Sequence, residues 1–483
     1  MKKKYVRWTL WTIASPFILF IILCILIYLP PIQNFLVDKA AVYASEATGM
    51  NISVGRISLS FPLNLVVTNV DAASPHNDTL LSVRRLQVNV QLLPLLKKQV
   101  EVDGISLQGA TVNSNDLIHG MKLNGTLGEL FISSHGVALD PETAIVNKVL
   151  LKDTDLSLCL NDTAAADTAA SDTTYWKIIL QDIDLQNVSF ALDMPLDSLS
   201  LAASLDNAIL RDGLIDLHKS AYSLQTFRIE NGRVRYDNGK PLAADSLSSG
   251  LDPSHIALTD IGVKLDSLYY GGRNMKAIIS QFVLKERSGV EIVSATGRMV
   301  SNDKVLRVPS LKLETRDSYL ELNAAMDWNA LDFKDEGLVS ARLMADIGKP
   351  DVVRFMGSMD EKFIRKYPSE PLRIRTGIDG DLNKLKLTTL TAELPGALEL
   401  FAKGELTSLT DSLLRGGDIT LQAETKDLKF ISTLAEGIEI PYGTRLEGKF
   451  TMAGPKMGTD LLLMQPEAHA VAVADTIPIT VYN

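Results

Sequence analysis

Residues from which metal, redox and nucleotide sites are usually built are scarce in this sequence. Its 483 residues include only two cysteines and six histidines. Cys24 and Cys159 are far apart, no Cys-x-x-Cys occurs, and no two histidines are close enough to form a local metal motif. A P-loop, a Gly-x-Ser-x-Gly elbow and a dinucleotide-binding glycine motif are also missing. The sequence therefore predicts no catalytic residue, no metal site and no cofactor. A hydrolase built from carboxylates on distant strands stays as the enzymatic alternative.

Clustered positive charge is equally scarce beyond the N-terminus. The formal net charge is -10, and basic residues pair at most, as in Arg84-Arg85 or Lys97-Lys98. Binding to a phosphate backbone requires a clustered basic surface, so we expect no nucleic-acid partner. With 46% hydrophobic and 22% charged residues, the chain has the composition of a protein with a large core, not of a disordered one.

One long apolar run is present near the start of the chain. Residues 13–29 carry no charge, and with their flanks they can cross a hydrocarbon core of about 30 Å as a helix. A cleaved signal peptide is the alternative, but the run exceeds a usual h-region and no small-x-small site follows closely. We therefore predict a transmembrane helix over 13–29. Aromatic rings near its ends favour the membrane interface, and the predicted anchor residues are Trp8, Trp11, Ile13, Tyr28 and Leu29.

The charges around this run predict its orientation. Lys2, Lys3, Lys4 and Arg7 precede it, whereas no positive charge follows until Lys39. The positive-inside rule then assigns residues 1–12 to a cytoplasmic tail and interface, with the rest of the chain on the far side of the membrane.

The segment after the anchor has helical spacing. Apolar residues of the 32–49 segment fall on one side of a helix, and Gly49 can end it. We predict a juxtamembrane amphipathic helix that either packs on the first strands or lies at the membrane surface. Because Lys39 is its only cationic residue, we favour packing on the strands.

From residue 50 the apolar pattern changes to every second residue. The clearest run is 85–92, and Val100 and Val102 resume the pattern after a connection at 93–98. Such alternation is typical of strands with one dry face. Helical spacing returns only at 352–364 and 428–435. We predict that residues 50–483 are mainly β, forming an antiparallel sheet with a few short helices.

Four short segments have the same order of residues. Each begins with an apolar strand end, continues with a polar or glycine corner, and is followed by a new alternation of apolar and polar residues. We interpret them as hairpin corners by which the sheet grows. They are residues 102–107, 151–156, 180–185 and 258–263.

Residues 161–174, NDTAAADTAASDTT, have low complexity and predict a mobile loop between two strands. Three Asp-Thr steps in it resemble a bacterial O-glycosylation acceptor pattern. The candidate acceptors are Thr163, Thr168 and Thr173. A plain solvated loop is the alternative, and we favour it because the pattern is short.

The order of these parts resembles the AsmA-like family, and the N-terminal part of TamB-type translocation and assembly module proteins in particular. The resemblance is carried by the anchor and four segments. These are ATGMNISVGRI at 47–57, FPLNLVVTNV at 61–70, LPLL followed by VEVDGI at 93–105, and YGTRLEGKF at 442–450. It is clearest over residues 1–115. The chain is far shorter than a full TamB-type protein, so it is either a short family member or a truncated gene product.

This resemblance implies a single-pass protein of a Gram-negative inner membrane, with a periplasmic β-rich body at 50–483. It implies an elongated, curled antiparallel sheet whose groove shelters lipid acyl chains, and a role in inter-membrane lipid transport or outer-membrane biogenesis, including protein secretion. The implied partners are membrane phospholipid and an outer-membrane assembly protein. The candidate groove residues are Leu86, Val88, Val90, Leu92, Val100 and Val102. An anchored envelope scaffold with a closed, dry β core is the alternative.

Overall fold

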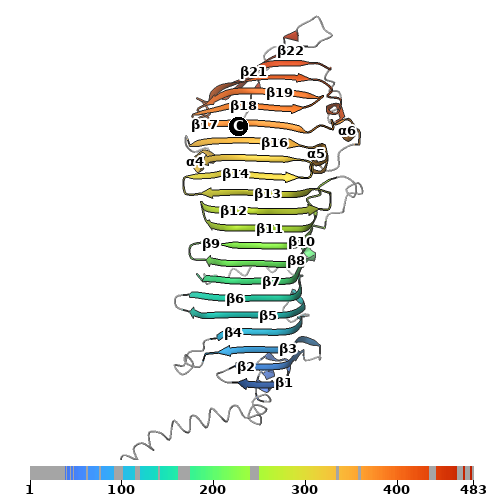
Figure 1. Cartoon of the computed structure of the whole chain (residues 1–483), viewed down its shortest axis with the longest axis vertical. Coiled ribbons are helices and arrows are strands. Elements are labelled where there is room, and N and C mark those ends of the chain that lie inside the picture. The colour runs from blue at the N-terminus through green and yellow to red at the C-terminus, as the bar shows by residue number, and fades with distance from the viewer. Residues whose placement is uncertain are drawn as a thin grey trace, which may run out of the picture. The chain divides into compact units, whose positions relative to one another are not determined.

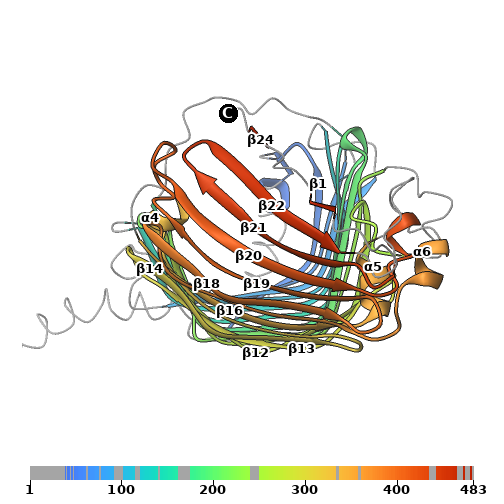
Figure 2. The same ribbon diagram turned by 90° about the horizontal axis from the view of Figure 1, so that it is seen from above.

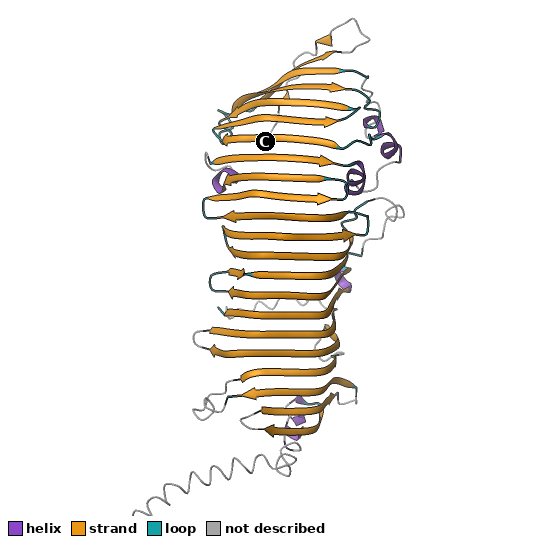
Figure 3. Cartoon of the chain, viewed as in Figure 1, coloured by secondary structure: helices purple, strands orange, loops and turns teal. Residues whose placement is uncertain are grey.

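The computed structural model divides into two compact units, which are described separately: residues 1–218 and 219–483. Within them the structure describes residues 39, 41–43, 45–46, 48–60, 64–74, 78–91, 102–114, 120–139, 142–161, 175–239, 250–332, 337–356, 361–433, 442–464, 472–473 and 479–480. Strands predominate in both units (Figures 1 and 3), so the prediction of a mainly β protein is confirmed.

The described part of the first unit is a sheet of eight sequential strands. They are β1 (Asn51–Ser60), β2 (Asn64–Ala73), β3 (Thr79–Val90), β4 (Val102–Asn113), β5 (Met121–Leu139), β6 (Glu142–Leu160), β7 (Lys177–Met194) and β8 (Leu199–Asp216). Each pairs with the next in antiparallel register, except that β6 and β7 run parallel. A parallel pair needs a crossover of a dozen or more residues, and the segment between β6 and β7 has that length. A 3-10 turn, η1 (Pro195–Asp197), joins β7 to β8.

The second unit continues with shorter strands. They are β9 (Ala221–Leu224), β10 (Thr226–Asp237), β11 (His255–Gly271), β12 (Asn274–Glu286), β13 (Glu291–Ser301), β14 (Val305–Thr315), β15 (Tyr319–Asp327), β16 (Leu338–Ile347), β17 (Leu372–Asp381), β18 (Lys384–Leu394), β19 (Leu398–Thr407), β20 (Gly416–Thr425), β21 (Arg445–Ala453), β22 (Lys456–Met464), β23 (Ala472–Val473) and β24 (Ile479–Thr480). From β10 to β22, sequential strands are antiparallel neighbours. β9 pairs with β11, while β23 and β24 pair with β22.

Short helices lie at the strand ends of this unit. They are α4 (Trp328–Leu331), α5 (Lys349–Phe355), α6 (Glu361–Lys366) and the 3-10 turn η2 (Ile431–Thr433). Figure 1 shows α4 at one end of the strands, and α5 and α6 at the other. The helical spacing at 352–364 therefore corresponds to two helices, whereas that at 428–435 yields only the 3-10 turn.

The densest core is at the strand ends that α6 and η2 cover. Phe363 of α6 meets Phe430 edge to face at 5.8 Å, and Tyr367 meets Phe430 at 5.2 Å. Leu394 and Ala397, at the β18–β19 turn, complete this buried cluster. This cluster therefore closes one end of the strands.

None of the four proposed hairpin corners is a strand end: residues 102–107 lie in β4, 151–156 in β6, 180–185 in β7 and 258–263 in β11. Asp153 in β6 and Asp260 in β11 have positive φ of 48° and 52°. The register shifts at Asp260, which identifies a β-bulge, whereas at Asp153 both paired strands skip one position and the register is kept. The interpretation of the four segments as strand ends was wrong, because an irregular residue inside a strand also interrupts the alternation.

Candidate functional site: an uncovered apolar sheet face

In the first unit the strand registers join apolar side chains into continuous rows. One row crosses all eight strands without a polar residue. It consists of Ile57, Val67, Leu86, Leu107, Leu130, Leu151, Leu185 and Ala208. Directly beside it runs a second row with the same property. It consists of Leu59, Leu65, Val88, Ile105, Ile132, Val149, Ile183 and Leu210. Side chains of alternate residues share one face of a sheet, so these rows form a single apolar surface.

On every strand there is a position at which the apolar side chains change between odd-numbered and even-numbered residues, and these eight changes of parity are aligned. We call these aligned positions the bend line, and at each of them the ladder of paired residues skips one position. The bend line consists of Gly55, Asn69, Arg84, Gly109, Gly128, Asp153, Asn187 and Asp206. Across it lies a third row on the same face: Val54, Val70, Val83, Ala110, Leu127, Thr154, Val188 and Leu205.

The residues of the bend line explain how the surface stays on one face. Asn69, Gly109, Asp153 and Asn187 have positive φ, a conformation that Gly, Asn and Asp accept most easily. Each inserts one residue, so the apolar positions beyond it return to the original face. At Gly109 the side chain of Arg84 lies 3.1 Å from where a Cβ would be, so a larger residue would also displace Arg84.

Solvent exposure shows which side of the bend is inner. The bend-line residues other than Gly109 and Gly128 are exposed. By contrast, Val83 and Thr154, beside the line, are 6% and 2% exposed. Leu81 and Phe190, one step farther along the same face, are 37% and 39% exposed. An inserted residue places extra backbone on the outer side of a bend, and Figure 2 shows the strands of this unit (teal to green) curving. The apolar surface is therefore on the inner side.

Among the described residues of this unit, the helical residues between 39 and 48 contact the sheet at β1, and no described element packs over the rest of the apolar surface. The unit's described elements are β1 to β8, η1 and helical residues between 39 and 48. Both clusters of buried apolar side chains found in the described residues are in the second unit. Most side chains of the three rows are accordingly only half-buried.

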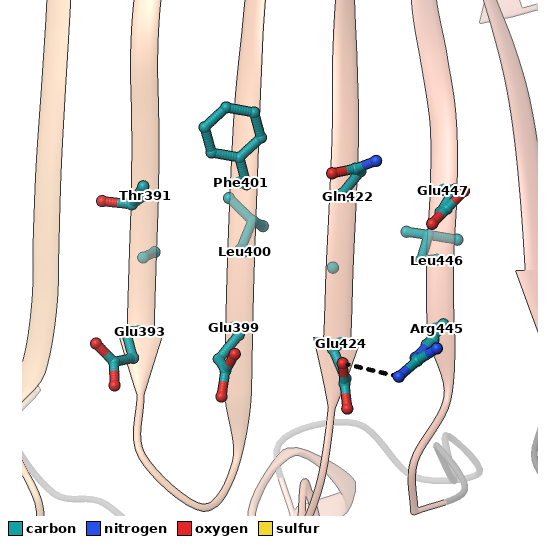
Figure 4. Close-up of a pocket in the computed structure, with 12 residues that line it drawn as sticks. Thr391, Glu393, Glu399, Leu400, Phe401, Gln422, Glu424, Arg445, Leu446 and Glu447 are labelled. Carbon is teal, nitrogen blue, oxygen red and sulfur yellow. Dashed lines mark ion pairs between the residues drawn. The ribbon is translucent and has the colours of Figure 1, made fainter.

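The second unit has an apolar face of the same kind. From β15 to β21 an unbroken row consists of Leu320, Ala345, Ile374, Ala392, Leu400, Ala423 and Leu446. The opposite face carries charged residues and a hollow of about 410 Å³ over β18 to β21. Figure 4 shows Thr391, Gln422 and Glu447 on this side, with Leu400 and Leu446 behind the ribbon.

Three of the four carboxylates of this hollow are paired. Glu393 is 3.4 Å from Arg373, Glu399 is 2.9 Å from Lys426, and Glu424 is 3.5 Å from Arg445. The fourth carboxylate of the lining is that of Glu447. The hydrogen bond to Glu399 raises the pKa of Lys426 above its ordinary value. Exposed pairs of this kind stabilise little.

A buried histidine lies between two carboxylates in the second unit. His255 Nδ1 lies 2.8 Å from Asp252, and its Nε2 lies 3.5 Å from Asp237. Hydrogen bonds from the Ser254 amide and from His255 lower the pKa of Asp252. The contacts of His255 tie the 252–255 turn to the end of β10. Among the residues that the structure describes, no group of three or more His, Cys, Asp and Glu side chains could hold a metal ion.

Three of the candidate groove residues, Leu86, Val88 and Val90, fall on the apolar face. Leu86 and Val88 belong to the first two rows, and Val90 lies beyond them on β3, all half-buried. Val102 pairs with Val90 across β3 and β4. Leu92 and Val100 lie outside the described residues. The larger part of the surface was missed, notably Leu107, Leu130, Leu151 and Leu185. A Gly, Asn or Asp at seven of the eight changes of parity is the signal that could have identified it.

Several other predictions fall outside the described part of the chain. They concern the anchor residues Trp8, Trp11, Ile13, Tyr28 and Leu29, and the loop residues Thr163, Thr168 and Thr173. Of the helices that are described, none has the length and apolar character needed to span a membrane. In the juxtamembrane segment, residues 39, 41–43, 45–46 and 48 are helical. Ser45 accepts a hydrogen bond from the Ile52 amide at 3.0 Å, so this helix contacts β1, while Val42 and Tyr43 remain exposed.

Comparison with known proteins gives no relative from which a function could be transferred. No family model, no curated protein and no solved structure matches the chain.

Proposed function

We propose that this protein binds the acyl chains of membrane phospholipids on its uncovered apolar face, as an AsmA-like protein anchored in the inner membrane with its body in the periplasm. The observation that carries the proposal is the pair of unbroken apolar rows across β1 to β8, with no described layer over them. Apolar surface left in water costs about 25 cal/mol per Å². A surface of this extent is therefore stable only if a ligand covers it, and the bent sheet forms the groove for that ligand.

The resemblance to TamB-type proteins supports the wider role. We propose that the bound lipid is carried between the two membranes, or supplied to outer-membrane assembly, with an outer-membrane assembly protein as partner. The proposal involves no enzymatic step.

A closed, dry scaffold is the competing account, and one pair of variants separates the two. Val88 lies on the apolar face, and its neighbour Gln87 lies on the opposite face. In a closed core, Val88→Asp buries an unpaired charge and destabilises by several kcal/mol, roughly 3 or more. In an open groove the carboxylate reaches water, so the fold persists while bound phospholipid falls.

The matched control is Gln87→Asp, which should change neither property. Thermal stability and co-purified phospholipid are measured for all three proteins. Collapse of Val88→Asp alone would favour the scaffold. A stable Val88→Asp protein with unchanged phospholipid would contradict lipid binding at this position.

The proposed orientation has its own test. A reporter that is active only in the periplasm should be active when fused after Asn483, because the N-terminal charges keep the tail inside. Activity of a cytoplasm-only reporter at that position would contradict it.

A further inference from the structure

The bend line divides the apolar face of the first unit into two panels. The rows directly beside it differ in side-chain size. One side carries mainly Val and Ala, including Val83 and Ala110, and the other carries a succession of leucines, including Leu107, Leu130 and Leu151. Beside the line Val83 and Thr154 are 6% and 2% exposed, whereas Leu81 and Phe190, farther out on the same face, are 37% and 39% exposed. The strip along the bend line is therefore the most sheltered part of the surface, and we call this strip across the strands the channel.

No polar group interrupts this channel. Thr154 is the one hydroxyl in its two rows, and it donates a hydrogen bond to the Lys152 carbonyl at 3.1 Å. Its methyl group is thus left to face the channel. The charges of the bend line, on Arg84, Asp153 and Asp206, belong to exposed side chains on the outer side. A headgroup or a polar peptide would find no partner along this line, and burying either without a partner is costly.

The direction of the channel further restricts its occupant. Strands β2 to β7 are paired on both edges, so their backbone groups are not available to an added strand. Seven strand spacings of about 4.8 Å give a length of roughly 34 Å. A hydrocarbon core of about 30 Å contains two leaflets, so one acyl chain extends roughly 15 Å. The channel therefore has the length of about two chains end to end and requires no hydrogen bond from them.

We infer that acyl chains lie along the bend line, perpendicular to the strands, between the Val83–Ala110 side and the Leu107–Leu130 side. This inference rests on the proposed lipid binding and adds the track within the face and the direction of the chain. Positions farther from the bend line on the same face, such as Leu123 and Leu158, then lie outside this track.

A photoreactive phospholipid tests the track. The full-length protein is loaded with a phosphatidylcholine that carries a diazirine in one acyl chain, irradiated and digested, and adducts are located by mass spectrometry. We expect adducts at Leu107, Leu130 and Leu151 to exceed those at Leu123 and Leu158 several-fold. Equal labelling of both sets, or labelling mainly on the polar face, would overturn the track.

A matched pair of variants adds a test by obstruction. Ala110 lies in the channel, whereas its neighbour Thr111 is exposed on the other face. Ala110→Trp should reduce adducts on β4 and β5 several-fold, and Thr111→Trp should leave them unchanged. If Ala110→Trp does not fold, the labelling pattern of the unmodified protein still decides.

Total phospholipid bound per chain is measured in parallel, because it separates the two claims. Binding with labelling away from the bend line contradicts the track alone. No binding of the probe or of co-purified phospholipid contradicts the proposed function, and the track with it.

Discussion

Asn187 donates a hydrogen bond from its side-chain amide to the Asp153 carboxylate at 2.9 Å, across the parallel strands β6 and β7. Both residues have positive φ, 51° and 48°, and both lie on the bend line. The bond therefore joins two positive-φ residues of the bend line across a parallel strand pair. This hydrogen bond indicates that the bend is a property of paired strands and not of a single strand.

The first prediction concerns this conformation. Asn187→Val introduces a β-branched residue at positive φ and removes the hydrogen bond, which should destabilise the protein by about 1–3 kcal/mol. Asn187→Gly keeps the backbone conformation available and should cost less than Asn187→Val. Chemical denaturation measures both, with Ser189→Val on the same strand as the control. Equal stability of the Val and Gly variants would contradict the role assigned to Asn187.

Asp351 provides a test of how α5 is held. It is 1% exposed and accepts hydrogen bonds from Ser318 at 2.6 Å and Arg354 at 3.0 Å, and from Thr315. Asp351→Ala leaves these donors without their acceptor and should destabilise by about 3–5 kcal/mol. Glu361→Ala removes a fully exposed ion pair with Arg365 and should cost less than about 0.5 kcal/mol. Similar melting temperatures for the two variants would show that α5 does not depend on Asp351.

The pKa of Asp252 gives a pH dependence. Hydrogen bonds from the Ser254 amide and His255 lower this pKa below the ordinary value of an aspartate. A carboxyl whose pKa is lowered by folding stabilises the folded state above its unfolded pKa, and this contribution disappears as pH falls through the folded value. We therefore expect stability to decline below about pH 4, and Asp252→Asn to reduce that decline. Melting temperatures between pH 2.5 and 7 for both proteins measure it, and parallel curves would refute the assignment.

The regions that the sequence describes well are those governed by local alternation. Residues 85–92 predict the second half of β3 correctly, because Leu86, Val88 and Val90 alternate without interruption. The first half, from Thr79, was not recognised, since the parity changes at Arg84. The same reason explains why Asp153 was interpreted as a strand end. A change of parity has the same appearance in sequence whether the chain turns back or inserts one residue.

Pairing between strands distant in sequence is harder to predict. Nothing in residues 177–194 indicates that β7 runs parallel to β6, because that depends on the connection and on the neighbours on both sides. The rows of the apolar surface also exist only once all eight registers are known. A single strand identifies Leu107 as inward-facing, but not that it stands beside Leu86 and Leu130.

The central claim is that phospholipid occupies the apolar face, and native mass spectrometry of the full-length protein, purified in a mild detergent, tests it most directly. The account predicts charge-state series displaced by one or more phospholipid masses, which persist when detergent is exchanged and decrease in Val88→Asp but not in Gln87→Asp. A protein that is fully folded and carries no phospholipid, in detergent or after incubation with phospholipid vesicles, would contradict it.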